Sequence, residues 1–322
     1  MIDLKSYFSP LEEDIYQKDF NWESTQFGSL VGSYNLTEFP EFKFFEIAVF
    51  SIREFEGSDN ASSDQKCKIR EALYHLHFET MPKICDLGYF KLSENRKDTF
   101  KNIELVCKEL IYQGIIPIVV GGGHDLTYAI YKSYSNLKKS ITLTSVDKKF
   151  DIGLKDDKIS NQSFFSKILE AKPNSLFHYS NIGYQSFFVS PLAVDMLSDL
   201  SFETFRLGDV SSNIKDIEPI MRNTDFLSFD ISAIKHSYAS ANIYSSPNGL
   251  TGEYACQIMR YAGLSDRLSS LIICEYNQLL DKNGQSAQLI SQMIWYFILG
   301  YKSRKNELNP NVKNCIKYTV SF

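Results

Sequence analysis

Two aspartates lie four residues apart in the segment SVDKKFDIG (145–153), directly after an apolar run. Asp147 and Asp151 flank a pair of lysines, Lys148 and Lys149. Carboxylates this close together at the end of a strand can bind a metal ion or transfer protons. A solvated charged loop explains this segment alone equally well, so the interpretation depends on what other segments bring to the same place.

Polar residues of the same kind end three further apolar runs. His124 follows IPIVVGGG, Asp230 and Ser232 close FLSFDIS, and Glu275 closes LIICE. A carboxylate inside an apolar strand, such as Asp230, is costly unless a cation or hydrogen-bond donors compensate it. The three glycines before His124 favour a tight turn, and they lack the spacing of nucleotide-binding loops. Together these segments predict a site of one histidine and several carboxylates.

The elements that must position these residues alternate along the chain. Apolar runs predict strands at 42–52, 116–120, 141–147, 174–183, 225–232 and 270–277. Helical spacing and capping residues predict helices at 62–78, 96–114, 125–135, 248–263 and 287–301. Short apolar strands between helices are typical of a parallel sheet covered on both faces, with functional residues beyond the carboxyl ends of its strands. We expect a single α/β domain over residues 1–322, with residues 1–40 as an N-terminal arm.

Composition restricts the classes of partner. The chain has 322 residues, of which 43% are hydrophobic, and a net charge of −5. The sequence has no cluster of Lys and Arg of the kind that binds nucleic acid. Its apolar segments are too short to span a membrane. The start, MIDLKSYFSP, lacks the pattern of a signal peptide. Six cysteines without C-x-x-C spacing are typical of reduced thiols in a cytoplasmic protein. We therefore expect a cytoplasmic protein.

The ordered motifs resemble those of one known family. GGGHD, DKKFD, SFDIS, SPNGLTGEYACQIMRYAG and EYNQLLD, spread over roughly residues 40–300, resemble the ureohydrolases, which include arginase, agmatinase and formimidoylglutamase. NIGYQ (181–185) looks most like the formimidoylglutamase branch. The resemblance implies the arginase–deacetylase fold, a three-layer α/β sandwich with a mainly parallel sheet of about eight strands. It also implies two bridged Mn²⁺ ions that hydrolyse a guanidine or formimidoyl C–N bond.

The resemblance implies one intact metal site and one that is lost. The positions that match the ligands of one ion are His124, Asp147, Asp151 and Asp230. The family's remaining histidine and aspartate correspond here to Lys149 and Ser232. We expect one Mn²⁺, with the Lys149 ammonium in the second ion's position, paired with Asp147 and Asp230, and Ser232 supplying a hydroxyl. The alternative is that Lys149 points to solvent and the site holds no metal.

The expected activity is hydrolysis of a linear amidine or guanidine, with formimidoylglutamate as the model substrate. The resemblance assigns catalytic roles to Asp151, Glu275 and Lys149, and substrate binding to Glu275 and Asn277. The alternative function is a non-catalytic protein that binds a small molecule or a protein partner in the same pocket. A deacetylase-like enzyme ranks third, because that family keeps the D-x-H ligands. Ureohydrolases commonly form trimers or hexamers, so the resemblance also allows a homo-oligomer, and the sequence does not fix the number of subunits.

Overall fold

The computed structural model describes residues 2–12, 22–36, 38–58, 68–153 and 159–305. Some sequence-based predictions fall outside these ranges. They are the first part of the helix expected at 62–78, part of the N-terminal arm, and Cys67 and Cys315. The four described cysteines, which are Cys85, Cys107, Cys256 and Cys274, are buried free thiols.

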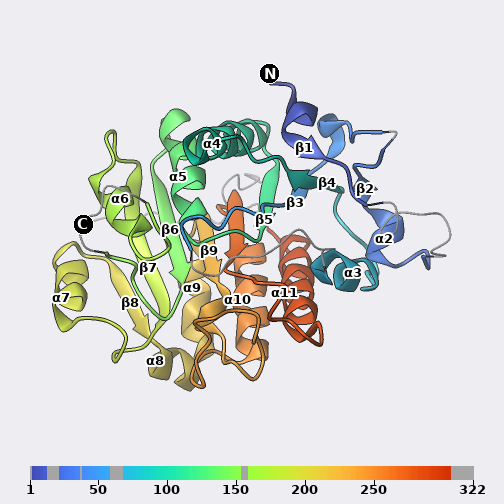
Figure 1. The fold of residues 1–322 in the computed structure, drawn as a ribbon. Helices are drawn as coiled ribbons and strands as arrows, with labels where there is room; N and C mark the ends of the chain where they lie inside the picture. Colours follow the sequence, from blue (N-terminus) through green and yellow to red (C-terminus); the bar gives the residue numbers. More distant parts are fainter. Residues whose placement is uncertain (1, 13–21, 37, 59–67, 154–158, 306–322) are drawn as a thin grey trace, which may run out of the picture.

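A single sheet forms the centre of the described structure (Figure 1). Within the described residues it has ten strands, in the order β1-β4-β3-β5-β10-β9-β6-β7-β8, with β2 also paired to β4. The strands are β1 (Phe8–Ser9), β2 (Gly32–Ser33), β3 (Ile47–Ser51), β4 (Ile84–Phe90), β5 (Ile116–Val120), β6 (Ile141–Val146), β7 (Leu176–Tyr184), β8 (Glu203–Arg206), β9 (Phe226–Asp230) and β10 (Ser270–Cys274). All the described pairings are parallel except that of β1 with β4, which confirms the predicted mainly parallel sheet.

Helices cover the sheet on both faces and give three layers (Figure 1). One layer contains α4 (Arg96–Tyr112), α5 (Leu126–Asn136), α6 (Phe164–Glu170) and α7 (Pro191–Asp199). The other contains α2 (Phe27–Leu30), α3 (Lys68–Tyr74), α8 (Leu207–Ser212), α9 (Ile217–Arg222), α10 (Gly252–Leu264) and α11 (Gln285–Tyr301). Short 3₁₀ helices are η1 (Leu4–Tyr7), η2 (Phe42–Phe44), η3 (Ile214–Asp216) and η4 (Ile231–Ala233). The helices predicted at 96–114, 125–135, 248–263 and 287–301 are present as α4, α5, α10 and α11. The helix predicted at 62–78 is described only over Lys68–Tyr74 (α3), and residues 75–78 are not helical.

Burial of both faces of the sheet explains why the strands are continuous apolar runs in the sequence. In β3, Ile47 and Val49 belong to the core on the α10–α11 side, whereas Ala48 and Phe50 belong to the core on the α4–α5 side. Successive side chains of a strand point to opposite faces. Since both faces are buried, neither set of positions is polar.

Among the described residues of the expected N-terminal arm, Phe8–Ser9 and Gly32–Ser33 are strands of the sheet. β1 and β2 both pair with β4, an element that was not predicted. Asp86 and Gly88 interrupt the apolar pattern of β4. The guanidinium of Arg70 donates to both oxygens of Asp86, at 2.8 and 3.0 Å, so this buried carboxylate is paired.

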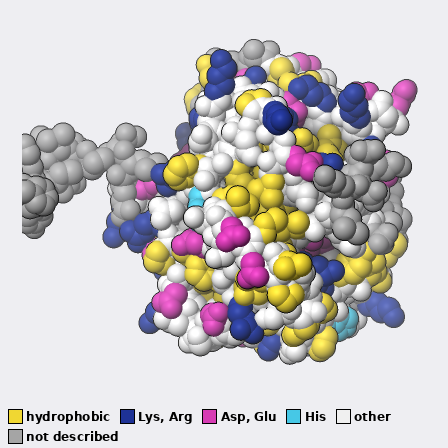
Figure 2. Space-filling model, turned by 90° about the vertical axis from the view of Figure 1, so that its left-hand side faces the viewer, with side chains coloured by type: hydrophobic (Ala, Val, Ile, Leu, Met, Phe, Trp, Pro, Cys, Tyr) yellow, Lys and Arg dark blue, Asp and Glu magenta, His cyan; other side chains and the backbone are white. Residues whose placement is uncertain are grey.

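The surface shows mixed charge. On the side that carries α7 and β8, acidic and basic side chains are interspersed around a central group of hydrophobic side chains (Figure 2). This pattern agrees with the small net charge of −5. Among the described helices, none combines the length and the apolar character needed to cross a membrane.

Candidate metal centre

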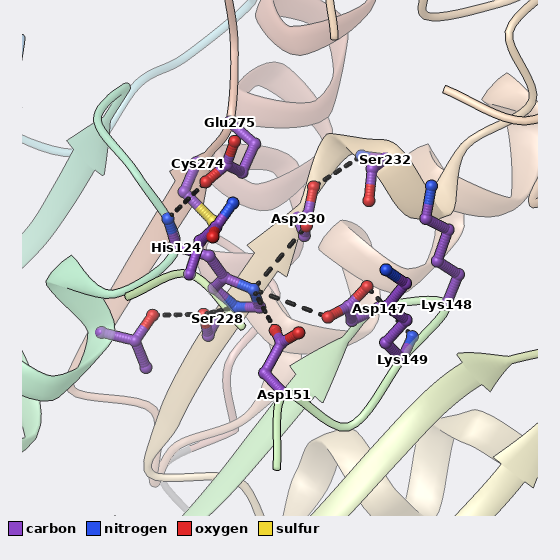
Figure 3. Close-up of polar contacts among 12 residues, drawn as sticks. His124, Asp147, Lys148, Lys149, Asp151, Ser228, Asp230, Ser232, Cys274 and Glu275 are labelled. Atoms are coloured by element: carbon purple, nitrogen blue, oxygen red, sulfur yellow. Dashed lines mark hydrogen bonds and ion pairs between the residues drawn. The ribbon is translucent and has the colours of Figure 1, made fainter. Parts of the chain in front are cut away.

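The candidate site lies where four neighbouring central strands end. β5, β10, β9 and β6 are adjacent and parallel, so their carboxyl ends meet at one edge of the sheet. His124 follows β5, Glu275 follows β10, Asp230 ends β9, and Asp147 and Asp151 follow β6. The structure therefore brings together the residues that the sequence predicted to converge (Figure 3).

The glycine turn after β5 directs His124 into this site. Gly121 and Gly122 have φ angles of 90° and 80°, in the left-handed region that favours glycine. A Cβ atom at Gly121 would lie 2.8 Å from the carbonyl oxygen of Ile52. Because neither position carries a side chain, the chain can turn immediately after the strand and place His124 over the ends of the neighbouring strands.

The ring of His124 is held at its Nε2 atom. Nε2 lies 2.8 Å from the hydroxyl of Ser228 on β9, which in turn lies 2.7 Å from the hydroxyl of Thr127 on α5. The ring also packs against Phe164, with 4.4 Å between ring centroids. These contacts fix the orientation of the imidazole and leave Nδ1 facing the carboxylates.

Three carboxylates surround Nδ1 of His124 (Figure 3). Nδ1 lies 3.0 Å from an oxygen of Asp151, 3.6 Å from one of Asp147 and 3.7 Å from one of Asp230. It is buried and has no hydrogen-bond partner of good geometry. Ligand atoms of His124, Asp147 and Asp151 all lie within 4.8 Å of one another. One imidazole nitrogen and several carboxylate oxygens form a donor set that suits a divalent first-row metal ion.

Burial and mutual repulsion disfavour the charged forms of these carboxyl groups. Burial raises the pKa of Asp151 to about 7. Burial, followed by the charge of Asp147, raises the pKa of Asp230 to about 6. The pKa of Asp147 is also raised well above its ordinary value, by burial and by Asp151. A divalent cation among these oxygens would oppose both causes. The four residues predicted as metal ligands therefore fit a cation.

Glu275 lies beside this cluster and connects its loops. The residue has a φ of 66°, an uncommon conformation for a side chain-bearing residue. One carboxylate oxygen accepts from the backbone N–H of His124 at 2.8 Å, and the other accepts from the hydroxyl of Ser58 at 2.7 Å. Asn161 donates to the same hydroxyl at 3.2 Å. Burial, then the charge of Asp230, raises the pKa of Glu275 to about 7.

Asn277, the other predicted substrate residue, takes part in the turn after β10. Its backbone N–H donates to the carbonyl of Ala241 at 2.7 Å, and its side-chain oxygen accepts from the N–H of Leu279 at 3.0 Å. Asn242 donates to the carbonyl of Glu275 at 2.9 Å from the adjoining loop. The described contacts of Asn277 thus shape the loop that carries Glu275.

The expected pairing of Lys149 is not present. In the part of the chain that the structure describes, its ammonium forms no ion pair with Asp147 or Asp230. The nitrogen instead lies 5.9 Å from the ring centroid of Tyr244. Ser232 is buried beside Asp230, and its backbone N–H donates to that carboxylate at 2.6 Å. The side chain of Lys149 extends toward the aromatic ring, and this explains why the predicted ion pair is absent.

Lys148, which was not among the predicted site residues, is the more buried of the two lysines. It is 3% exposed, and its ammonium donates to the backbone carbonyl of Tyr244. Burial lowers its pKa, while the charges of Asp230 and Asp147 act in the opposite direction. One indication in the sequence that a lysine could be buried here was the pair of lysines between the two aspartates. A loop that directs Asp147 and Asp151 into the protein can also direct a residue between them inward.

Short polar residues behind the site were also not predicted. They are Ser58, Thr127, Asn161 and Ser228. Ser228 carried a weak signal as a polar residue within the apolar run FLSFD. The others lie in segments whose patterns do not mark them.

Comparisons with known proteins agree with this geometry. The family model described as the arginase family matches residues 58–300. The formimidoylglutamase of Staphylococcus carnosus (strain TM300) is 27% identical over 242 residues, which is 71% of this chain and 77% of that protein. Among solved structures, Trypanosoma cruzi formiminoglutamase with Mn²⁺ has a TM-score of 0.75 at 18% identity, covering 87% of this chain and 99% of that one. The formimidoylglutamase of Bacillus subtilis has a TM-score of 0.74 at 17% identity, covering 89% and 95%. These likenesses confirm the predicted arginase–deacetylase fold.

Proposed function

The chain belongs to the arginase family, and we therefore propose that it hydrolyses a C–N bond of a linear amidine, with formimidoylglutamate as substrate. Formimidoylglutamases are among its relatives at 27–28% identity. The observation that carries the proposal is the buried Nδ1 atom of His124, with three carboxylates at 3.0–3.7 Å.

The proposed cofactor is one Mn²⁺ ion. Its ligands would be His124, Asp147, Asp151 and Asp230. When bound, Mn²⁺ supplies a water molecule of lowered pKa for attack on the amidine carbon. The positions that match the remaining ligands of a two-metal site carry Lys149 and Ser232, which favours a single ion.

Glu275 is the proposed partner of the amidinium group. Its two oxygens already accept from His124 and Ser58, which fixes the carboxylate in place. A carboxylate group can accept several hydrogen bonds, so Glu275 would also accept N–H groups of the substrate. Water adds its oxygen to the amidine carbon, the C–N bond to glutamate breaks, and the leaving nitrogen takes a proton, so that formamide and glutamate are released. Asp151 is the proposed acceptor of the proton that water loses. Lys149 would add a nearby positive charge.

The test measures metal content and turnover on the same preparations. After loading with Mn²⁺ and removal of excess metal, we expect about one Mn²⁺ per chain by inductively coupled plasma mass spectrometry. We also expect release of formamide from formimidoylglutamate, with weaker release of urea from arginine or agmatine. His124→Ala should lose both the metal and the activity.

His178→Ala is the matched control. His178 lies near the amino end of β7, where it pairs with Glu203 at 3.2 Å, away from the carboxyl ends that form the site. This variant should retain metal and turnover. Absence of both Mn²⁺ binding and turnover in the unmodified protein would contradict the proposal and favour a non-catalytic binding protein.

A further inference from the structure

The dipeptide Asn-Gly occurs twice in the sequence, as Asn248–Gly249 and Asn283–Gly284. At this dipeptide an asparagine loses its side-chain amide most readily, because the glycine has no side chain to obstruct attack by its own backbone nitrogen. Asn248 lies in the loop before α10 and Asn283 in the loop before α11, and both asparagines are exposed. The surroundings of the two glycines therefore decide where the reaction can occur.

Asn283 and Gly284 form part of an open turn. A Cβ atom added to Gly284 would meet no other part of the protein within 4 Å. The N–H of Gly284 has only a long contact, of 3.4 Å, with the carbonyl of Asp281. Asn283 borders two surface clefts of about 590 and 670 Å³, which give its side chain room to rotate. The side-chain amide and the backbone nitrogen that must attack it can therefore approach each other here.

Asn248 and Gly249 have the same residue types but closely packed surroundings. A Cβ atom at Gly249 would lie 2.6 Å from the carbonyl oxygen of Ala233, and that oxygen accepts from the N–H of Leu250 at 2.8 Å. The carbonyl of Asn248 accepts from the side chain of Gln185 at 3.2 Å. Rotation of the peptide group between Asn248 and Gly249 toward the side-chain amide would break these contacts.

We propose that Asn283 is a site of spontaneous deamidation, from which the fold protects Asn248. The backbone nitrogen of Gly284 loses its proton and attacks Cγ of Asn283. The bond from Cγ to the amide nitrogen breaks, and ammonia leaves with that proton. Water then opens the cyclic imide at either of its carbonyl groups, so that aspartate or isoaspartate replaces the asparagine. Water is the only co-reactant, and neither a metal ion nor a substrate takes part.

The product carries a negative charge in the segment that joins Glu275 to α11. Asp281, in the same segment, caps this helix, because its carboxylate accepts from the N–H groups of Ser286 at 3.1 Å and Ala287 at 2.9 Å. Deamidation makes the net charge of −5 more negative by one unit per chain. Isoaspartate also adds a carbon atom to the backbone between Asp281 and the helix. The reaction therefore changes both the charge and the length of the connection between the candidate site and α11.

The experiment incubates the unmodified full-length chain in mildly alkaline buffer, folded in one sample and unfolded by urea in another. Peptide mapping by mass spectrometry follows the mass gain at each asparagine, and chromatography separates aspartate from isoaspartate. In the folded protein, we expect Asn283 to deamidate at least about 10-fold faster than Asn248, because attack at Asn248 requires local opening. In urea, the two rates should agree within about threefold, because the native contacts that distinguish the sites are lost.

Two variants serve as controls. Asn283→Gln would have to form a larger ring, so this variant should lack the acidic species that appears on isoelectric focusing of the incubated protein. Asn248→Gln should leave the rate at Asn283 unchanged. Equal rates at the two asparagines in the folded protein, or an Asn283 that is still intact when the unfolded chain has reacted completely, would overturn the proposal. These measurements do not depend on turnover, so their outcome is separate from that of the proposed function.

Discussion

The two ring nitrogens of His124 lie in different surroundings. Nε2 is 2.8 Å from the hydroxyl of Ser228, and Nδ1 faces three carboxylates. A histidine that ligates a metal through one nitrogen usually has the other oriented by a hydrogen bond, and this partner sets both the tautomer and the ring position. Ser228 holds Nε2 here and is itself held by Thr127.

Ser228→Ala should weaken Mn²⁺ binding without unfolding the protein. The substitution leaves the Nε2 atom of His124 without its hydroxyl partner, so the ring loses its fixed orientation. We expect the Mn²⁺ dissociation constant to rise about 10-fold, by analogy with other outer-shell partners of metal ligands, as measured by calorimetry.

Ser270→Ala is the control for this loss of a buried hydroxyl. Ser270 is also fully buried on a central strand and lies 2.7 Å from the hydroxyl of Tyr134, but it starts β10, at the edge of the sheet opposite the site. Its dissociation constant for Mn²⁺ should remain within about twofold of that of the unmodified protein. Equal effects of the two substitutions would mean that Ser228 acts through general stability alone.

Residue types and their order identified most of the candidate site, but they did not identify which of the two lysines between Asp147 and Asp151 is buried. His124, Asp147, Asp151 and Asp230 each follow or end a central strand, and this position can be read from the apolar runs. The side chain of Lys148 is directed by the carbonyl of Tyr244, which lies 96 residues further along the chain. A local pattern contains no information on such a contact, so the choice between two adjacent lysines requires the tertiary structure.

At the scale of elements, one arginine joins the loops behind the site. Arg96, the first residue of α4, donates to the carbonyl of Ile159 at 2.7 Å and pairs with Glu54 at 3.3 Å. It also forms an ion pair with Asp125, which is fully buried and directly follows His124. The arginine thus connects the start of a helix with three loops that border the site.

Arg96→Met should destabilise the protein strongly. It would leave the buried carboxylate of Asp125 without its cation, and breaking a buried pair from one side typically costs about 3–5 kcal/mol. Urea unfolding should show a loss of this size. Combining it with Asp125→Asn should recover part of the loss, because the uncompensated charge is then gone.

Arg222→Met provides the comparison for an exposed pair. Arg222 and Glu218 lie four residues apart on α9, and the arginine side chain is 55% exposed. Exposed helical pairs of this kind contribute less than about 1 kcal/mol, so this variant should unfold close to the unmodified protein. A loss below about 1 kcal/mol for Arg96→Met as well would show that Asp125 does not depend on the arginine.

The elements that the sequence predicted are those buried on both faces. β5, β6, β9 and β10 are short apolar runs, and their neighbours α4, α10 and α11 show clear helical spacing. β4 was missed because Asp86 breaks its pattern; this buried carboxylate is compensated by Arg70, sixteen residues earlier, and by further donors that include the hydroxyl of Tyr74. The shorter helices α6 to α9 were also missed, since their few turns give little periodicity.

At the scale of the whole molecule, the acidic cluster links stability to pH. The ordinary pKa of an aspartate is 3.8, whereas burial raises that of Asp151 to about 7 in the folded, metal-free protein. Between these values the folded protein retains a proton that the unfolded chain has released. The free energy of unfolding of the metal-free protein therefore decreases as pH rises through this window. Asp230, whose pKa is raised to about 6 by burial and by Asp147, acts in the same direction.

In the metal-free protein, thermal stability should fall as pH rises. Bound Mn²⁺ should oppose this fall. With a chelator present, we expect the melting temperature to fall by about 5 °C between about pH 4.5 and pH 8, from the raised pKa values of the cluster. Mn²⁺ binds the ionised carboxylates, so the increase in melting temperature that it causes should grow over the same window. Differential scanning fluorimetry with and without Mn²⁺ measures both trends. Asp151→Asn should weaken the fall of the metal-free melting temperature with pH and abolish most of the increase that Mn²⁺ causes.

A metal-free melting temperature that rises between about pH 5 and pH 7 would contradict this prediction. It would show that the carboxylates of the site ionise without cost, and hence that they do not form the closely packed cluster on which metal binding depends.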